Sequence, residues 1–158
     1  MRSLAIALAI LGLGLASCGS KEDASLSVYA QNPVVKKTAN PFGFKLEGSV
    51  DVVFDEGAYS QGSVTVDNVS LRLFRGTNTV VLPRAKIELT AASPHFPLTI
   101  AAGEKKTTSW TIAIDQLTAD EITELCAGPV SVSGTVDQQG KHDPTRVATT
   151  PVAPQGCP

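Results

Sequence analysis

Apolar and polar residues alternate over much of the chain. In residues 44–54 (FKLEGSVDVVF) the apolar positions from Phe44 to Phe54 fall on one side, and charged residues such as Lys45 and Glu47 fall on the other. A period of two with charges on one side predicts an antiparallel strand that buries one face. We therefore expect this segment to be a long strand of a sheet that packs against a core.

The same alternation recurs in shorter stretches along the chain. Further strands are expected at 26–31, 62–66, 69–73, 79–82, 85–89, 97–101, 110–114, 130–136 and 146–150. Loops are expected at Asn32-Pro33, Asn40-Pro41 and Ser93-Pro94. About eight to ten short strands at this spacing predict a β-sandwich or barrel. Three aromatic residues fall on inward faces and are expected in its core, namely Phe44, Phe54 and Trp110.

One short helix is predicted at 118–127. Thr118 and Glu121 have the spacing of a capping box, in which each side chain binds the other residue's backbone N–H. Gly128 and Pro129 follow and are typical of a helix end. The helix would interrupt the series of strands near its end.

The middle of the chain resembles immunoglobulin-like domains. From Phe96 through 98–104 to Trp110, a strand, a Gly-Glu turn and a second strand follow one another, as in pilus-chaperone-like sandwiches. The resemblance implies an all-β, antiparallel immunoglobulin-like β-sandwich. An antibody-type domain is not expected, because Trp110 precedes both Cys126 and Cys157 instead of lying between two cysteines.

The N-terminus resembles the signal peptide of bacterial lipoproteins. Met1-Arg2 is followed by an apolar stretch at 4–15, which as a helix would span about 18 Å and is too short to cross a bilayer. The next residues, Leu15-Ala16-Ser17-Cys18, resemble a lipobox. The resemblance implies cleavage between Ser17 and Cys18, a diacylglycerol on the Cys18 sulfur, and a fatty acyl chain such as palmitate on its amino group.

This resemblance implies three parts: a signal peptide at 1–17, a lipidated tether at 18–25, and a β-sandwich domain at 26–158. The protein would lie in the cell envelope, anchored to a membrane through Cys18. In a Gram-negative cell, Gly19-Ser20 lacks the Asp that retains enterobacterial lipoproteins in the inner membrane. The outer membrane is then expected, on its periplasmic face or at the surface. The alternative is an ordinary secretory signal with a chance cysteine.

Under this interpretation, one of the three cysteines is lipidated and the other two are left to pair with each other. Cys18 takes the lipid, and outside the cytoplasm Cys126 and Cys157 are expected to form a disulfide. The bridge would close a loop of roughly 30 residues, contribute roughly 3–4 kcal/mol, and tie the proline-rich C-terminal tail to the domain. The alternative of a redox-active pair is disfavoured, because the two residues lack CxxC spacing.

No residue pattern indicates catalysis, a metal or a cofactor. The net charge of −2 gives no basic surface for nucleic acid. Gly-x-Ser-x-Gly, Ser-x-x-Lys and phosphate-binding glycine motifs are absent from the sequence. His95 and His142 are interpreted as surface loop residues. Several carboxylates that might gather around Ca²⁺ are interpreted as turn residues instead, namely Asp55, Glu56, Asp67, Asp137 and Asp143.

Two loop aromatics, Phe42 and Tyr59, are the candidate contacts with a partner. We expect a lipid-anchored envelope protein that is not an enzyme and that acts structurally or binds an envelope protein or polysaccharide. The alternative is a carrier of a small ligand or metal in the envelope.

Overall fold

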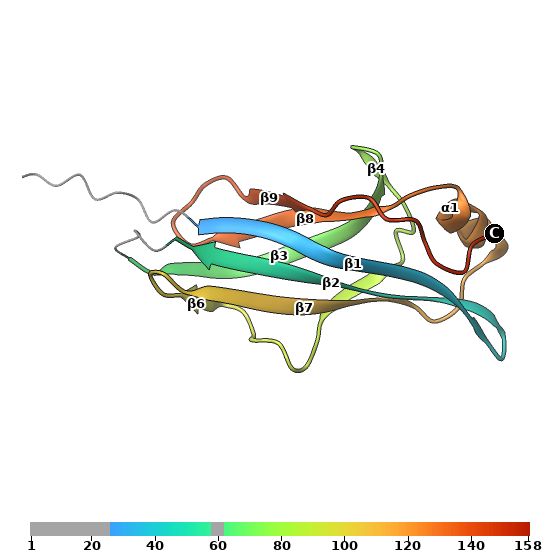
Figure 1. Ribbon diagram of the computed structural model, residues 1–158, viewed down its shortest axis with the longest axis horizontal. Helices are drawn as coiled ribbons and strands as arrows, with labels where there is room; N and C mark the ends of the chain where they lie inside the picture. Colours follow the sequence, from blue (N-terminus) through green and yellow to red (C-terminus); the bar gives the residue numbers. More distant parts are fainter. Residues whose placement is uncertain (1–25, 58–61) are drawn as a thin grey trace, which may run out of the picture.

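The computed structural model describes residues 26–57 and 62–158. Two antiparallel sheets face each other and form the expected β-sandwich (Figure 1). One sheet has the strand order β1-β2-β7-β5; the other has the order β4-β3-β8-β9, with β6 also paired to β3. The elements are β1 (Leu26–Asn40), β2 (Gly43–Glu56), β3 (Val64–Arg75), β4 (Thr79–Val80), β5 (Lys86–Leu89), β6 (Leu98–Ile100), β7 (Lys105–Ile114), α1 (Ala119–Cys126), β8 (Ser131–Gln138) and β9 (Thr145–Ala148).

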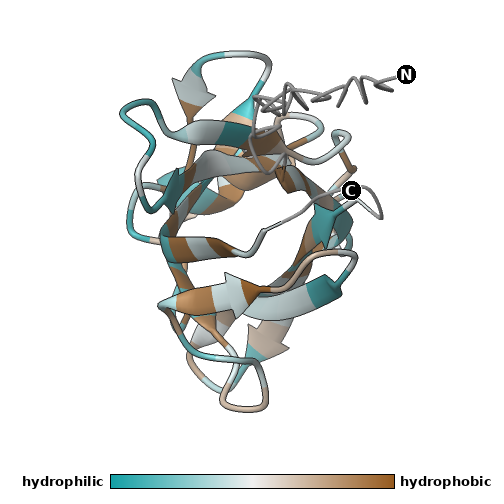
Figure 2. Ribbon diagram, turned by 90° about the vertical axis from the view of Figure 1, so that its left-hand side faces the viewer, coloured by the Kyte–Doolittle hydropathy of each residue, from teal (hydrophilic) through white to brown (hydrophobic). Residues whose placement is uncertain are grey.

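The core lies between the two sheets and is built by the alternation seen in the sequence. Figure 2 shows hydrophobic and pale segments following one another along the strands of both layers. Phe54 and Trp110 are buried there, as predicted. The ring of Phe96 joins them, with its centre 6.2 Å from that of Phe54 and 6.0 Å from that of Trp110. The indole N–H of Trp110 donates to the Thr108 hydroxyl at 3.0 Å, so the buried indole is not left without a partner.

The prediction that Phe44 belongs to the core is wrong. Phe44 shares a face of β2 with the buried Leu46, but its side chain is 38% exposed. The β1–β2 hairpin continues past the end of the facing sheet (Figure 1), so that sheet does not cover its last residues. The amine of Lys37 lies 4.8 Å from the centre of the Phe44 ring instead.

The predicted loop at Asn32-Pro33 is also wrong, because both residues lie within β1. The pairing with β2 is interrupted by a bulge between Gln31 and Val34. Proline has no N–H to donate and fits where pairing is interrupted, and Asn32 takes a positive φ of 53°, which asparagine tolerates better than most residues. The Asn32 amide donates to Asp51 on β2 at 3.0 Å.

The predicted helix is confirmed as α1, with both halves of its capping box. The Glu121 N–H donates to the Thr118 hydroxyl at 3.2 Å, and the Thr118 N–H donates to the Glu121 carboxylate at 2.8 Å. The guanidinium of Arg84 donates to both oxygens of the same carboxylate, at 2.8 and 2.7 Å. This contact with Arg84 lowers the pKa of Glu121 to about 2. In the part of the chain that the structure describes, no helix is long and apolar enough to span a bilayer.

The C-terminal tail closes one side of the sandwich. Val152 pairs with Val130, next to β8 in one sheet, and Gln155 pairs with Lys36, on β1 in the other sheet. The predicted disulfide between Cys126 and Cys157 is confirmed. The bridge joins the end of α1 to the tail, so the tail is held at the helix as well as at both sheets.

A candidate partner-binding site at the hairpin end

The long strand β1 runs from one end of the molecule to the other. Leu26, which follows the expected tether, lies at one end, and the turn between β1 and β2 lies at the other, together with α1 and the C-terminus (Figure 1). A strand of 15 residues spans about 45 Å. We call the second end the hairpin end and define it by the turn at 40–43, residues 115–117 and α1.

Phe42 forms the tip of the hairpin end, and its side chain is 82% exposed. Within the described residues it is the most exposed large hydrophobic side chain. Its backbone is ordered by the neighbouring Asn40, whose side-chain oxygen accepts the Phe42 N–H at 2.9 Å. Gly43 completes the turn with a φ of 133°, a conformation open to glycine and rarely to other residues. The turn therefore holds an aromatic ring out into solvent.

Residues 115–117 hold this turn from one side. Three hydrogen bonds join the two segments: Asn40 Nδ2 donates to the Asp115 carbonyl (2.9 Å), Gln116 Nε2 to the Phe42 carbonyl (3.4 Å), and the Leu117 N–H to the Phe44 carbonyl (2.8 Å). The Leu117 side chain is buried, so the supporting segment is itself anchored in the core. The backbone of Phe42 is thus held at its N–H by Asn40 and at its carbonyl by Gln116.

A hollow of about 490 Å³ lies beside the hairpin on the four-stranded sheet. It is lined by Arg84, Lys86, Glu88, Thr111, Ala113, Ile114, Asp115 and Gln116. Gln116 belongs to both features, since it lines the hollow and donates to the Phe42 backbone. The rim carries charges of both signs, which suits the polar and charged side chains of a protein partner.

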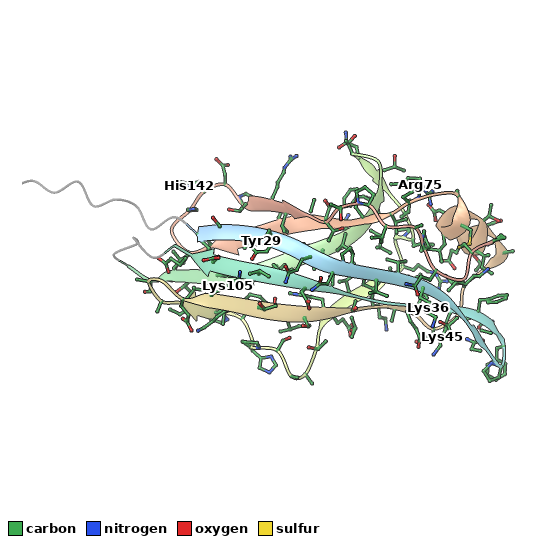
Figure 3. All side chains as sticks on the ribbon, in the orientation of Figure 1. Tyr29, Lys36, Lys45, Arg75, Lys105 and His142 are labelled. Carbon is green, nitrogen blue, oxygen red and sulfur yellow. A yellow bond between two sulfur atoms is a disulfide. The ribbon has the colours of Figure 1, made fainter. Side chains whose placement is uncertain are left out.

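Three lysines lie on the strands that lead to and from the aromatic tip. Lys36, Lys37 and Lys45 all lie on the β1–β2 hairpin, and Figure 3 shows Lys36 and Lys45 on the half of the hairpin nearest its turn. Glu47 offsets part of this charge, because its carboxylate lies 2.5 Å from the Lys45 amine and the residue pairs with Lys36 across the two strands. The hydrogen bond from Lys45 lowers the pKa of Glu47. Residues 36–47, the part of the hairpin nearest its turn, therefore keep an excess of positive charge, with three lysines and one glutamate, although the whole chain has a net charge of −2.

The other residues singled out in the sequence lie elsewhere. Ser17, Cys18 and Tyr59 fall outside the described residues. His95 and His142 are exposed in loops, as predicted.

Gln116 is part of the hairpin end and Phe44 lies directly beside it, and neither was foreseen there. The signal at Asn40-Pro41 identified the turn, whereas nothing in the local sequence indicates that residues 115–117 lie against it. These contacts join residues about 75 positions apart, beyond the reach of turn and pattern rules.

Comparison with protein-family models, with curated proteins and with solved structures gives no match. The function is therefore inferred from the chemistry and geometry of the chain itself.

Proposed function

We propose that this protein is a bacterial lipoprotein of the cell envelope that presents the hairpin end of a non-enzymatic β-sandwich to an envelope protein. The lipid on Cys18 would hold it at a membrane, the outer membrane in a Gram-negative cell. One observation carries the proposal: Phe42 is 82% exposed, held in a well-bonded turn, and placed at the end of β1 opposite Leu26. An aromatic side chain this exposed buries little surface within its own chain, which favours a role in contact with a partner.

The expected anchor and the hairpin end are placed for this role. The tether at 18–25 reaches at most about 25 Å, so Leu26 and its end of the sandwich would lie near the membrane. The length of β1, about 45 Å, would then carry the hairpin end away from the bilayer. Binding energy at protein interfaces concentrates in a few aromatic and arginine residues, and a turn already ordered before binding loses little conformational entropy.

The charges around Phe42 indicate the kind of partner. Lys36, Lys37 and Lys45 favour an acidic surface, and complementary charge speeds association and selects the partner. A protein groove that receives the Phe42 ring between acidic residues fits both features. A polysaccharide is the other partner expected from the sequence, and the crosslinking experiment below separates the two.

The proposed anchor is tested by intact-mass measurement of the protein extracted from membranes. The expected mass is that of a chain beginning at Cys18 and carrying acyl groups. A mass that begins elsewhere, or an unmodified Cys18, would contradict the anchor and leave the partner proposal to be tested separately.

The proposed partner contact is tested by photocrosslinking in cells. A photoreactive phenylalanine derivative replaces Phe42 in the full chain, and Lys141 receives the same group as a control because it is exposed in the β8–β9 loop. We expect one discrete envelope-protein adduct at position 42 and none at 141. Adducts with polysaccharide, identical adducts at both positions, or no adduct at 42 would each overturn the proposed protein partner.

A further inference from the structure

The outer face of the five-stranded sheet carries a second hollow, of about 420 Å³. It is lined by Phe74, Thr77, Asn78, Ser133, Gly134, Thr135, Arg146, Val147 and Ala148. This hollow is built on β3, β8 and β9 and on the turn before β4. It shares no residue with the hollow beside the hairpin.

Two arginines lie on this face. Arg146 lines the hollow, and Arg72 lies beside it as the cross-strand neighbour of Ser133, which lines the hollow. Arg72 on β3 pairs with Ser133, and Arg146 on β9 pairs with Thr135, so β8 runs between the two arginines. Adjacent strands lie about 4.8 Å apart, and Ser133 and Thr135 lie about 7 Å apart along β8, so the backbones of the two arginines are about 12 Å apart across the sheet. Both arginines are exposed, and their side chains share the outer face because paired residues point to the same side of a sheet.

Neither guanidinium has a partner within the described residues. Arg75 and Arg84 are each bonded to α1, whereas Arg72 and Arg146 take part in no side-chain hydrogen bond or ion pair there. Asp137 lies two residues after Thr135 on β8 and on the same face. Within the described residues it forms no ion pair with either arginine. Two unneutralised arginines on one sheet face form a site of positive charge that suits an anion.

The floor between the arginines offers the other contacts that a sugar needs. The hydroxyls of Ser133 and Thr135 are half-buried on β8, and Asn78 adds an amide from the turn before β4. Phe74 is half-buried and lies on the same outer face, since its neighbour Leu73 is in the core. A ring provides an apolar surface beside donors and acceptors, and no carboxylate lines the hollow to repel an anion.

We infer that this hollow binds an anionic sugar, with Arg72 and Arg146 holding its acidic group and the hydroxyls of Ser133 and Thr135 holding its ring oxygens. Guanidinium groups bind carboxylates and phosphates with paired hydrogen bonds, so a uronic acid and a sugar phosphate share the required chemistry. The site is independent of the lipid anchor and of the hairpin end.

The inference is tested by calorimetric titration of the full chain in detergent with three probes: trigalacturonate, mannose 6-phosphate and neutral maltotriose. We expect one of the anionic probes to bind and maltotriose not to bind. Which anionic probe binds identifies the acidic group. Binding of maltotriose with equal strength, or no binding of either anionic probe, would overturn the inference.

Variants then locate the site. Arg72→Gln and Arg146→Gln should each weaken binding by tenfold or more, while Lys86→Gln, an exposed cation on the opposite sheet, should leave it unchanged. Phe42→Ala should also leave it unchanged, which separates this site from the hairpin end. Because Arg72 and Arg146 are exposed and form no ion pair, we expect both variants to keep the parent melting temperature. Unaltered binding in both arginine variants would overturn the proposed location.

Discussion

The N–H of Lys37 donates a hydrogen bond of 2.8 Å to the carbonyl of Gln155. The N–H of Gln155 in turn donates to the carbonyl of Val35 at 2.9 Å. Among the described strands, β1 is an edge strand of its sheet, and the C-terminal tail occupies this edge. An uncovered strand edge invites pairing with other chains, so the tail protects the edge as well as closing the sandwich.

Removal of the disulfide should destabilise the protein and free this edge. For Cys126→Ser combined with Cys157→Ser, we expect the free energy of unfolding to fall by about 3–4 kcal/mol, because the bridge no longer restricts a long loop of the unfolded chain. Urea titration measures the change, and light scattering should show slow association of the variant. Reductant should lower the stability of the parent to the same level; equal urea midpoints with and without the bridge would contradict the expectation.

Glu121 should make the stability depend on pH in the acid range. Its pKa is lowered from 4.5 to about 2 in the folded protein, so its contribution is complete above about pH 4.5 and is lost as the pH falls toward 2. Glu121→Gln should reduce the loss of stability over this window, measured by urea titration at each pH. Glu88→Gln, whose side chain forms no bond with Arg84, should keep the parent profile. A parent-like profile for Glu121→Gln would contradict the role of this ion pair.

Phe42→Ala should leave stability nearly unchanged, because the side chain is 82% exposed and exposed positions of this kind change stability by about 0.5 kcal/mol or less. Leu46→Ala, four residues away and buried, should cost about 2–5 kcal/mol. Thermal unfolding followed by circular dichroism compares the two. A large loss for Phe42→Ala would mean that the ring supports its own fold instead of a partner contact.

Asn40→Ala should loosen the turn that carries Phe42. The substitution removes one bond to the Phe42 N–H and one to the Asp115 carbonyl, and the expected cost is about 1–2 kcal/mol. Hydrogen exchange of the Phe42 N–H should become faster. The Leu117 N–H serves as an internal control, because its bond to Phe44 remains; equal acceleration at both would indicate general unfolding.

Gly134→Ala should be strongly disfavoured. A Cβ atom on Gly134 would collide with the Ser70 carbonyl on β3, where the two backbones approach closely. We expect a loss of about 1–3 kcal/mol, measured by urea titration. Gly57→Ala is the matched control, since a Cβ there meets nothing within 4 Å; equal losses in the two variants would contradict this explanation.

Local patterns in the sequence predicted most of the architecture. Period-two alternation found the strands because each one buries a single face, and the pair Thr118 and Glu121 found the helix because capping acts within one turn. The disulfide followed from the expectation that Cys18 is lipidated and that Cys126 and Cys157 remain.

Features set by distant parts of the chain were not predictable in this way. The exposure of Phe44 depends on where the opposite sheet ends, and the support of Phe42 depends on residues 115–117. The hollow lined by Arg146, with Arg72 beside it, requires the strand order β3-β8-β9, which no local pattern specifies.

The course of β1 also has a mechanical consequence. If the membrane holds Cys18 and a partner holds Phe42, a pulling force between them runs along the backbone of β1 itself, which is already extended from Leu26 to Asn40. The pairing with β2 holds β1 to its sheet on both sides of the bulge between Gln31 and Val34. A pull between the membrane and the partner would thus act on a strand that is already extended, and the chain between the two points would lengthen little.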